Sequence, residues 1–179
     1  MTAIQASAPR GAKLEDYEYG WADFLLKLKT HLETESLERA VQLRALLRAR
    51  PAEVYRTWLS PTALSRILPG RAKIGRRPGQ RFTWQHRLGR HVHQGVFLAL
   101  EKNRKIAFTW ERPEAGGEPP SEVVVEAQAV AYGTLVSLHH RGLLRLHRGQ
   151  LFGQRMFWAR LLERLRCYCY FKGKIKAAA

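Results

Sequence analysis

Histidine is the residue type in this sequence that comes nearest to a catalytic or metal-binding pattern. His91 and His93 would share one face of a strand, and His139 adjoins His140. An imidazole can transfer a proton or bind a metal, but either role needs further ligands or an orienting partner. No Asp, Glu or Cys completes such a set, and a histidine on a strand more often only forms hydrogen bonds. The sequence therefore predicts no catalytic residue, no metal and no cofactor.

Other signatures of enzymes are absent from the sequence. It contains no P-loop, no Rossmann glycine pattern and no nucleophile elbow. Cys167 and Cys169 are one residue apart, which suits neither a disulfide between distant segments nor a zinc or redox motif. No apolar run approaches about 18 residues, and the N-terminus lacks the pattern of a signal peptide. We therefore expect a protein without a membrane span, located in the cytoplasm.

Positive charge is concentrated in one part of the chain. The 179 residues carry 31 Lys and Arg against 15 Asp and Glu, a net charge of +16. Residues 1–38 have four basic and seven acidic side chains, a net charge of −3, so residues 39–179 hold +19. Such a surface favours an acidic protein, anionic lipid or nucleic acid as partner, although solvated arginines spread over the whole surface give the same total. Nucleic acid has no support from a motif.

Two terminal helices and a run of strands must position these side chains. Residues 14–32 place apolar side chains at helical spacing, and a second stripe consists of Leu151, Trp158, Leu161, Leu162, Leu165 and Cys169. Residues 21–29 and 158–166 align without gaps and share Trp, Ala and two Leu. Convergence of two amphipathic helices explains the leucines, but the shared Trp-Ala favours duplication. We interpret residues 1–36 as the remnant of a preceding repeat and residues 37–179 as the domain.

The N-terminal stripe has a consequence for assembly. Its apolar side chains are Leu14, Tyr17, Trp21, Phe24, Leu25, Leu28 and Leu32. A stripe of this size would expose several hundred square ångströms of apolar surface if it stayed in water. We expect it to pack on the sheet of its own chain or on a second copy, which would give a homodimer.

The middle of the chain is mostly strand. Hydrophobic residues make up 45% of the sequence, enough for a globular core. Residues 40–48 suit a helix or a strand, and short helices are predicted at 51–59 and 60–68. Alternating apolar and polar residues predict strands at 81–88, 91–101, 105–111, 121–132 and 134–140. Short turns between them indicate an antiparallel sheet, whose apolar face the C-terminal helix must cover. The fold class is α+β.

Five motifs within residues 38–171 carry a resemblance to a known family. They are residues 50–61 (RPAEVYRTWLSP), 78–82 (PGQRF), 95–96 with 106–110 (GV, IAFTW), 133–143 (GTLVSLHHRGL) and Trp158. In this order they resemble the domains homologous to the activator of the heat-shock-90 chaperone ATPase. These domains belong to the START/polyketide-cyclase-like (SRPBCC) superfamily. The resemblance implies a helix-grip fold, a curved antiparallel sheet wrapped around a long C-terminal helix, with two short helices after the first strand.

The same resemblance implies a ligand site. In this superfamily an apolar cavity often lies between the sheet and the terminal helix. Two inward polar groups would face it here, His86 and His140. The apolar residues expected to line it are Phe82, Trp84, Phe97, Phe108, Trp110, Leu138, Trp158 and Leu162. These aromatics would otherwise simply fill the core.

Three functions follow from these observations. The leading interpretation is a non-enzymatic domain that binds a hydrophobic small molecule in that cavity. The second is a co-chaperone-like module, connected with the stress response, that binds an acidic partner through its arginine-rich outer surface. The third is an enzyme of the cyclase or aromatase type, against which the missing acid–base pair counts.

Overall fold

The computed structural model describes residues 20–26, 40–86, 92–113, 119–143, 146 and 148–177. Within them, seven strands form one antiparallel sheet in the order β1-β7-β6-β5-β4-β3-β2. The strands are β1 (Val41–Leu47), β2 (Gly70–Ile74), β3 (Arg81–His86), β4 (Val92–Glu101), β5 (Lys105–Trp110), β6 (Ser121–Val130) and β7 (Gly133–Arg141). The helices with assigned bounds are α2 (Pro51–Trp58), α3 (Pro61–Ile67) and α4 (Arg148–Ala177).

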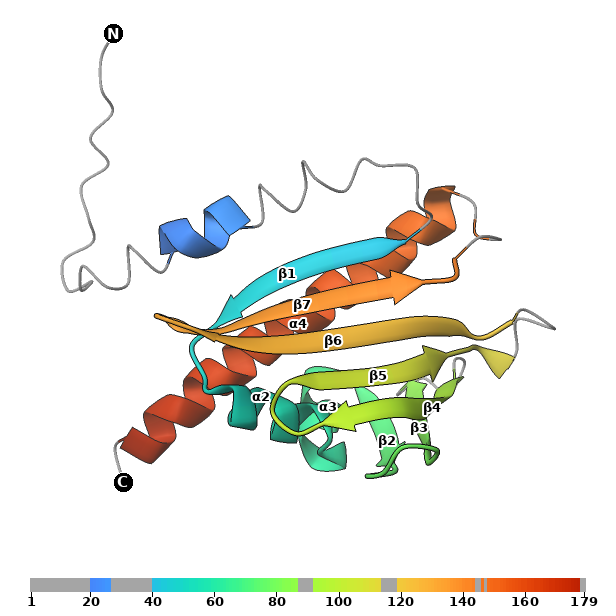
Figure 1. The fold of residues 1–179 in the computed structure, drawn as a ribbon, viewed down its shortest axis with the longest axis horizontal. Coiled ribbons are helices and arrows are strands. Elements are labelled where there is room, and N and C mark those ends of the chain that lie inside the picture. Colours follow the sequence, from blue (N-terminus) through green and yellow to red (C-terminus); the bar gives the residue numbers. More distant parts are fainter. Residues whose placement is uncertain are drawn as a thin grey trace, which may run out of the picture.

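The long helix α4 lies across one face of the curved sheet (Figure 1). Its buried side chains recur every three or four residues and form the predicted stripe: Trp158, Leu161, Leu162, Leu165 and Cys169. Alternate residues of the strands face it, so that Val136, Leu138 and His140 of β7 are buried together with Val123 and Val125 of β6. The α+β class and the helix-grip fold are therefore confirmed.

Strand β4 turns the sheet around the helix. Its first half pairs with β3 and its second half with β5, and the register shifts between Phe97 and Ala99. Gly95 stands at the close approach between these strands. A Cβ there would lie 1.8 Å from the carbonyl oxygen of Thr109 and 2.7 Å from the ring of Phe82. Glycine at this position therefore lets β4 bend and leaves room for the Phe82 ring beneath it.

The two short helices follow β1 and begin where the sequence predicts. Proline occupies the first turn of each, where its missing N–H costs nothing. The Ser60 hydroxyl accepts a hydrogen bond from the Ala63 N–H and caps α3. Helix α3 packs on β2 and on α4, so it closes the end of the sheet at which β2 is the edge strand.

Two elements differ from, or extend, the sequence-based predictions. Residues 40–48, which suited either a helix or a strand, contain β1. Strand β2 was missed, because Arg71 and Lys73 made this stretch look like a basic cluster. Ala72 and Ile74 alternate with them and point inward, a pattern too short to stand out from the sequence. The charged residues suit an edge strand, since they discourage pairing with other chains.

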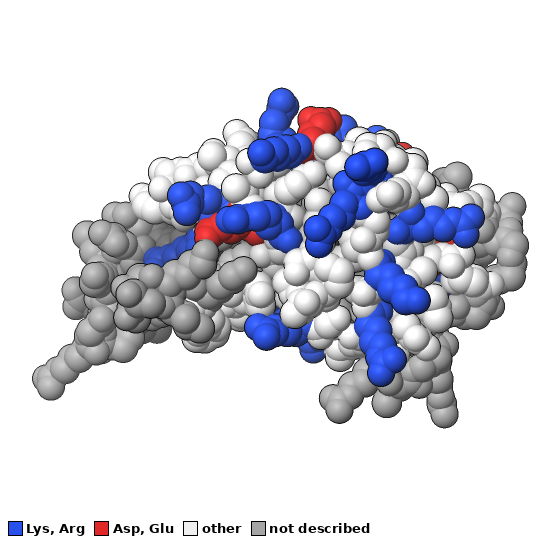
Figure 2. All heavy atoms as spheres, turned by 90° about the horizontal axis from the view of Figure 1, so that it is seen from below, with Lys and Arg blue, Asp and Glu red and all other residues white. Residues whose placement is uncertain are grey.

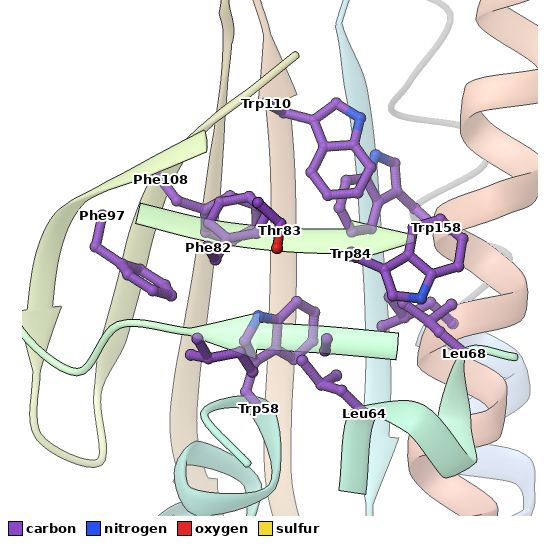
Figure 3. Close-up of a pocket in the computed structure, with 13 residues that line it drawn as sticks. Trp58, Leu64, Leu68, Phe82, Thr83, Trp84, Phe97, Phe108, Trp110 and Trp158 are labelled. Carbon is purple, nitrogen blue, oxygen red and sulfur yellow. The ribbon is translucent and has the colours of Figure 1, made fainter. Parts of the chain in front are cut away.

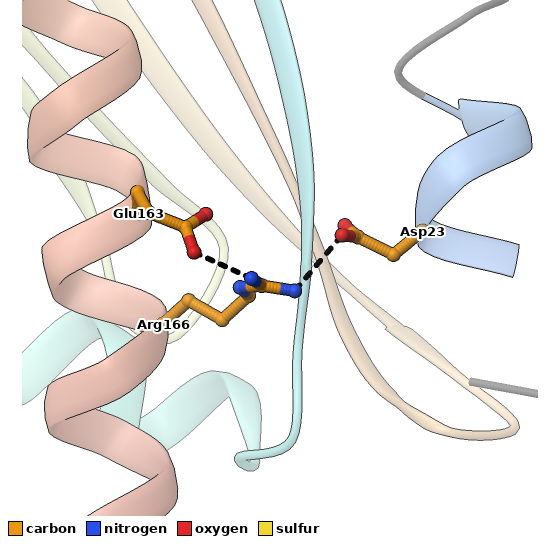
Figure 4. A network of polar contacts seen from close by, with 3 residues as sticks. All are labelled: Asp23, Glu163 and Arg166. Atoms are coloured by element: carbon orange, nitrogen blue, oxygen red, sulfur yellow. Dashed lines mark hydrogen bonds and ion pairs between the residues drawn. The ribbon is translucent and has the colours of Figure 1, made fainter. Parts of the chain in front are cut away.

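The N-terminal stripe is described only in part. The helix at residues 20–26 meets the body through Asp23, which is 5% exposed, and its Oδ2 lies 2.9 Å from Nη1 of Arg166 in α4 (Figure 4). Trp21, Phe24 and Leu25 are each more than half exposed. The described part of the stripe therefore does not pack on the sheet of its own chain. Packing on a second copy stays a prediction, and the rest of the stripe and the boundary at residue 36 lie outside the described residues.

No helix in the described ranges is both long and apolar enough to cross a membrane.

Candidate functional site

An apolar cavity lies between the inner face of the sheet and α4, at the end of the sheet formed by β2 and β3 (Figure 3). Helices α2 and α3 form its floor with Trp58, Leu64 and Leu68. The sheet and α4 supply the rest of the lining: Ala72, Ile74, Phe82, Thr83, Trp84, Phe97, Phe108, Trp110, Trp158 and Leu161. Thr83 is the one polar side chain among these 13 residues. The lining can therefore enclose apolar groups but offers them almost no hydrogen bond.

The free space in the cavity is small, about 40 Å³. By this measure a water molecule needs roughly 10–15 Å³, so the space holds only a few atoms. Aromatic rings fill the remainder. The ring centroids of Phe82 and Phe108 are 5.2 Å apart, and those of Trp110 and Trp158 are 4.8 Å apart. A larger ligand would enter only if some of these rings moved.

The structure brings together six of the ten residues that the sequence suggested as a ligand site. Phe82, Trp84, Phe97, Phe108, Trp110 and Trp158 line the cavity. Leu138 and Leu162 are buried in the hydrophobic core and do not line it. His86 lies at the end of β3 and lines a separate surface groove, and His140 lines a different pocket. The two histidines therefore do not face the cavity together.

Sequence reasoning missed the side of the cavity that α2, α3 and β2 provide. Trp58 was recognised only as a core residue of its helix, and Ala72 and Ile74 belong to the strand that was not predicted. The alternation of these two residues with Arg71 and Lys73 was the signal available. Leu64 in α3 and Leu68 at its C-terminal end, four residues apart, gave a second one.

His140 belongs to a buried chain of hydrogen bonds. The indole Nε1 of Trp158 donates to Nδ1 of His140 over 2.9 Å, and Nε2 of His140 lies 2.7 Å from the Ser121 hydroxyl. The Ser121 hydroxyl in turn donates to the carbonyl oxygen of Trp110 over 2.8 Å. An indole N–H can only donate, so a neutral His140 carries its proton on Nε2 and donates to Ser121. Each polar group in this series of hydrogen bonds then has a partner, and the series joins α4 to β7, β6 and β5.

This arrangement decides what the Ser121–His140 pair can do. A serine next to a histidine is the geometry of an activated nucleophile, in which the imidazole accepts the hydroxyl proton. Here Nε2 already holds a proton and Nδ1 is occupied by Trp158. Burial, reinforced by the nearby charge of His93, lowers the pKa of His140 to about 3. The imidazole is therefore a structural hydrogen-bonding group and a poor base.

A second pocket, of about 250 Å³, shares Trp110 with the cavity and is more polar. His140, Ser121, Glu111 and Gln154 contribute to its walls. Glu111 accepts a hydrogen bond from the Gln94 side chain over 2.8 Å, which holds the carboxylate against β4. The pocket and the cavity are thus neighbours on either side of the Trp110 side chain.

The histidine pair considered for a metal does not form a metal site in the described residues. His91 lies outside them, and His93 stacks between Trp84 and Trp110, with ring centroids 5.3 and 4.4 Å apart. Nowhere in the described ranges do three His, Cys, Asp or Glu side chains come together as metal ligands would. His93 thus contributes a flat ring to the aromatic cluster.

Comparison with known proteins identifies the family. The family of activator of Hsp90 ATPase homolog 1-like proteins matches residues 48–169, about two thirds of the chain and the whole region from the end of β1 into α4. The chain belongs to this family. The proposed resemblance to SRPBCC domains is therefore confirmed, and the fold is one shared by ligand-binding and polyketide-cyclase-like domains in general. No functionally curated protein sequence matches the chain.

Solved structures of similar fold support the assignment. The crystal structure of protein MLL2253 from Mesorhizobium loti is 21% identical with a TM-score of 0.66, and the match covers 72% of this chain and 95% of that one. The solution structure of the Aha1 dimer from Colwellia psychrerythraea is 16% identical, with a TM-score of 0.62 and coverages of 73% and 95%. An HSP90 activator from Plasmodium falciparum is 16% identical, with a TM-score of 0.59 and coverages of 70% and 92%. At these identities the likeness concerns the fold.

Proposed function

We propose that this Hsp90 ATPase activator-like domain binds a flat apolar small molecule in the cavity between the sheet and α4. The observation that carries the proposal is the lining itself, in which Thr83 is the single polar side chain among 13 residues. A concave site walled by aromatic rings is the usual form of a small-molecule site. Rings that pack edge to face can slide apart and accept another ring between them, because aromatic pairs tolerate several offset geometries.

We also propose that the domain catalyses no reaction on this ligand. Among the residues that the structure describes, no carboxylate or histidine lines the cavity, and a general acid or base must lie within hydrogen-bond reach of the reacting atom. The nearest candidate pair, Ser121 and His140, uses its hydrogen bonds to hold α4 on the sheet. Because Ser121 and His140 already form hydrogen bonds with their neighbours, neither is available to act on a ligand. The proposed role of the cavity is therefore binding only.

The test is binding of a neutral apolar fluorophore, Nile red, with 1-octanol as competitor. Trp84→Leu removes part of the cavity wall without breaking a hydrogen bond in the described structure. We expect it to tighten binding of Nile red at least about fivefold, equivalent to about 1 kcal/mol. Phe152→Ala is the matched control, since Phe152 is 65% exposed on α4 and does not line the cavity. If neither the natural protein nor Trp84→Leu binds either compound, the proposal is wrong.

A second candidate function is a co-chaperone-like module that binds an acidic protein partner. It draws support from the family and from the basic surface seen in Figure 2, where Lys and Arg far outnumber Asp and Glu. Exposed basic residues follow one another along β2, the loop after it and β3: Arg71, Lys73, Arg76, Arg77 and Arg81. Binding to an Hsp90-type chaperone that weakens steeply as salt rises would favour this function, because exposed charge pairs are screened by salt.

A further inference from the structure

A surface groove of about 760 Å³ opens beside the cavity, between α3, the β2–β3 pair and α4. Arg66 of α3, Arg71 of β2 and Arg164 of α4 line it from three different elements. Its remaining lining residues are Ser65, Pro69, Gly70, Gln85 and His86. No carboxylate stands among them, so the groove presents donors and positive charge.

The arginines of the groove are not neutralised by neighbouring acids. The sequence has no Asp or Glu between Glu53 and Glu101, the stretch that supplies α3, β2 and β3. In the described part of the chain, no ion pair involves Arg66, Arg71 or Arg164. Arg164 donates from Nη1 to the carbonyl oxygen of Ile67 over 3.1 Å, which holds it at the end of α3. Guanidinium groups placed in this way bind phosphate and carboxylate oxygens, often two at a time.

The groove and the cavity follow one another along the same face of the β2–β3 pair. Ile74 pairs with Phe82 and Ala72 with Trp84, and all four line the cavity. The next pair on that face, Gly70 and His86, lines the groove. Alternate residues of a strand are about 7 Å apart, so the pair that lines the groove lies only about 7 Å from the last pair that lines the cavity. On α4, just under one helical turn leads from Leu161 in the cavity to Arg164 in the groove.

Trp84 marks the boundary between the two sites. Its side chain is 6% exposed, and its indole N–H is buried without a hydrogen-bond partner in the described structure. This nitrogen lies 2.8 Å from the position that a Cβ would take at Gly70. A buried donor without an acceptor is costly, and the oxygen of an anion that reached past Gly70 would supply one.

We propose that the groove binds the anionic group, a phosphate or a carboxylate, of an amphipathic ligand whose apolar part occupies the neighbouring cavity. The inference rests on the proposed function, because it assumes that the cavity accepts an apolar group. It adds the chemical class of the ligand: an apolar ring or chain that ends in an anion. An apolar cavity that adjoins a groove lined by arginines of α3, β2 and α4 fits such a molecule better than it fits an acidic peptide, which would use the arginines without the cavity.

The experiment compares octyl phosphate, octanoate, 1-octanol and inorganic phosphate by isothermal titration calorimetry on the full chain. We expect octyl phosphate to bind more tightly than octanol and than inorganic phosphate. The double variant Arg66→Gln/Arg71→Gln should lose about tenfold or more in affinity for octyl phosphate, because it removes charge-assisted hydrogen bonds. It should bind octanol as the natural protein does. The matched control Lys73→Gln/Arg76→Gln removes the same charge from exposed neighbours that do not line the groove.

The outcomes separate this inference from the proposed function. If octanol binds but octyl phosphate binds no more tightly, or if the Arg66/Arg71 variant binds octyl phosphate unchanged, the groove is not the anion site and the proposed function stands. If inorganic phosphate binds as tightly as octyl phosphate, the anion does not need the cavity and the inference is overturned. Tighter binding of a hexaglutamate peptide that displaces octyl phosphate would overturn it in favour of a protein partner. If Nile red binds but no octyl compound does, the inference is overturned and the proposed function stands. If neither Nile red nor an octyl compound binds, the proposed function fails and the inference fails with it.

Discussion

His140 shows how one buried polar residue can hold a fold together without taking part in chemistry. Its ring accepts from Trp158 of α4 and donates to Ser121 of β6, and Ser121 donates to β5. The side chain is fully buried, so each of these bonds is protected from water. A second proton on the ring would break the bond from Trp158, since Nδ1 would become a donor facing a donor. The network therefore requires a neutral imidazole.

The native protein should accordingly lose stability on acidification below about pH 6.5. In the unfolded chain His140 titrates near 6.5, whereas burial lowers its pKa to about 3 in the folded protein. Between these values only the unfolded state is protonated, so unfolding takes up a proton and the free energy of unfolding falls as pH falls. At pH 5 the loss from this residue is about 2 kcal/mol. Denaturant unfolding at several pH values measures it.

The matching variant is His140→Gln, whose amide can accept from Trp158 and donate to Ser121 without titrating. We expect its free energy of unfolding to depend less on pH, by about 1 kcal/mol per pH unit between pH 6 and pH 4. His139→Gln is the comparison: burial also lowers the pKa of that half-buried ring, helped by the charge of Arg141, so its slope should change in the same direction but by less. An unchanged slope in His140→Gln would show that the histidine is protonated in the folded state.

At the scale of elements, β4 lies so close to β5 at Gly95 that this position should tolerate no side chain. Gly95→Ala would place a methyl group 1.8 Å from a backbone oxygen of β5, and backbone cannot move aside as a flexible side chain can. We expect a loss of at least about 2 kcal/mol in the free energy of unfolding. Gly153→Ala is the control within α4, where nothing lies within 4 Å of the new Cβ. Alanine should stabilise that helix by about 0.5–1 kcal/mol. Equal effects of the two changes would contradict the role given to Gly95.

The elements that could be predicted from the sequence are those with a long, regular pattern. The stripe of α4 and the alternation in β3 and β7 extend over enough residues to fix both type and inner face, which is why Phe82, Trp84 and Trp158 were placed correctly. Strand β2 has five residues and two arginine or lysine side chains, so its charge concealed its alternation. The side of the cavity formed by β2 and α3 depended on that strand and was missed. His86 was assigned to the cavity because alternation gives the face of a residue but not where along the strand the cavity ends.

At the scale of the whole molecule, the net charge of the domain is poorly balanced. Residues 39–179 hold 27 basic and 8 acidic side chains, a net charge of +19, and the ion pairs of the described residues include Lys105–Glu101 and the two made by Arg166. Partly exposed pairs of this kind contribute little, typically below about 1 kcal/mol each. With more than three basic side chains for each acidic one in residues 39–179, we expect repulsion among the exposed basic side chains to outweigh attraction.

Added salt should for this reason stabilise the protein. Two unit charges 10 Å apart in water repel by about 0.4 kcal/mol, and physiological ionic strength screens most of that repulsion. Summed over the basic surface, we expect the free energy of unfolding to rise by on the order of 1 kcal/mol between 10 and 150 mM sodium chloride. A variant with glutamine at the exposed positions Arg71, Lys73, Arg76, Arg77 and Arg81 should show a weaker rise.

Sulfate compared with chloride at equal ionic strength adds a second measurement, because an anion that binds the arginine groove stabilises the folded state beyond screening. Stability that falls as sodium chloride is added would mean that ion pairs, and not repulsion, dominate the charge balance of the domain.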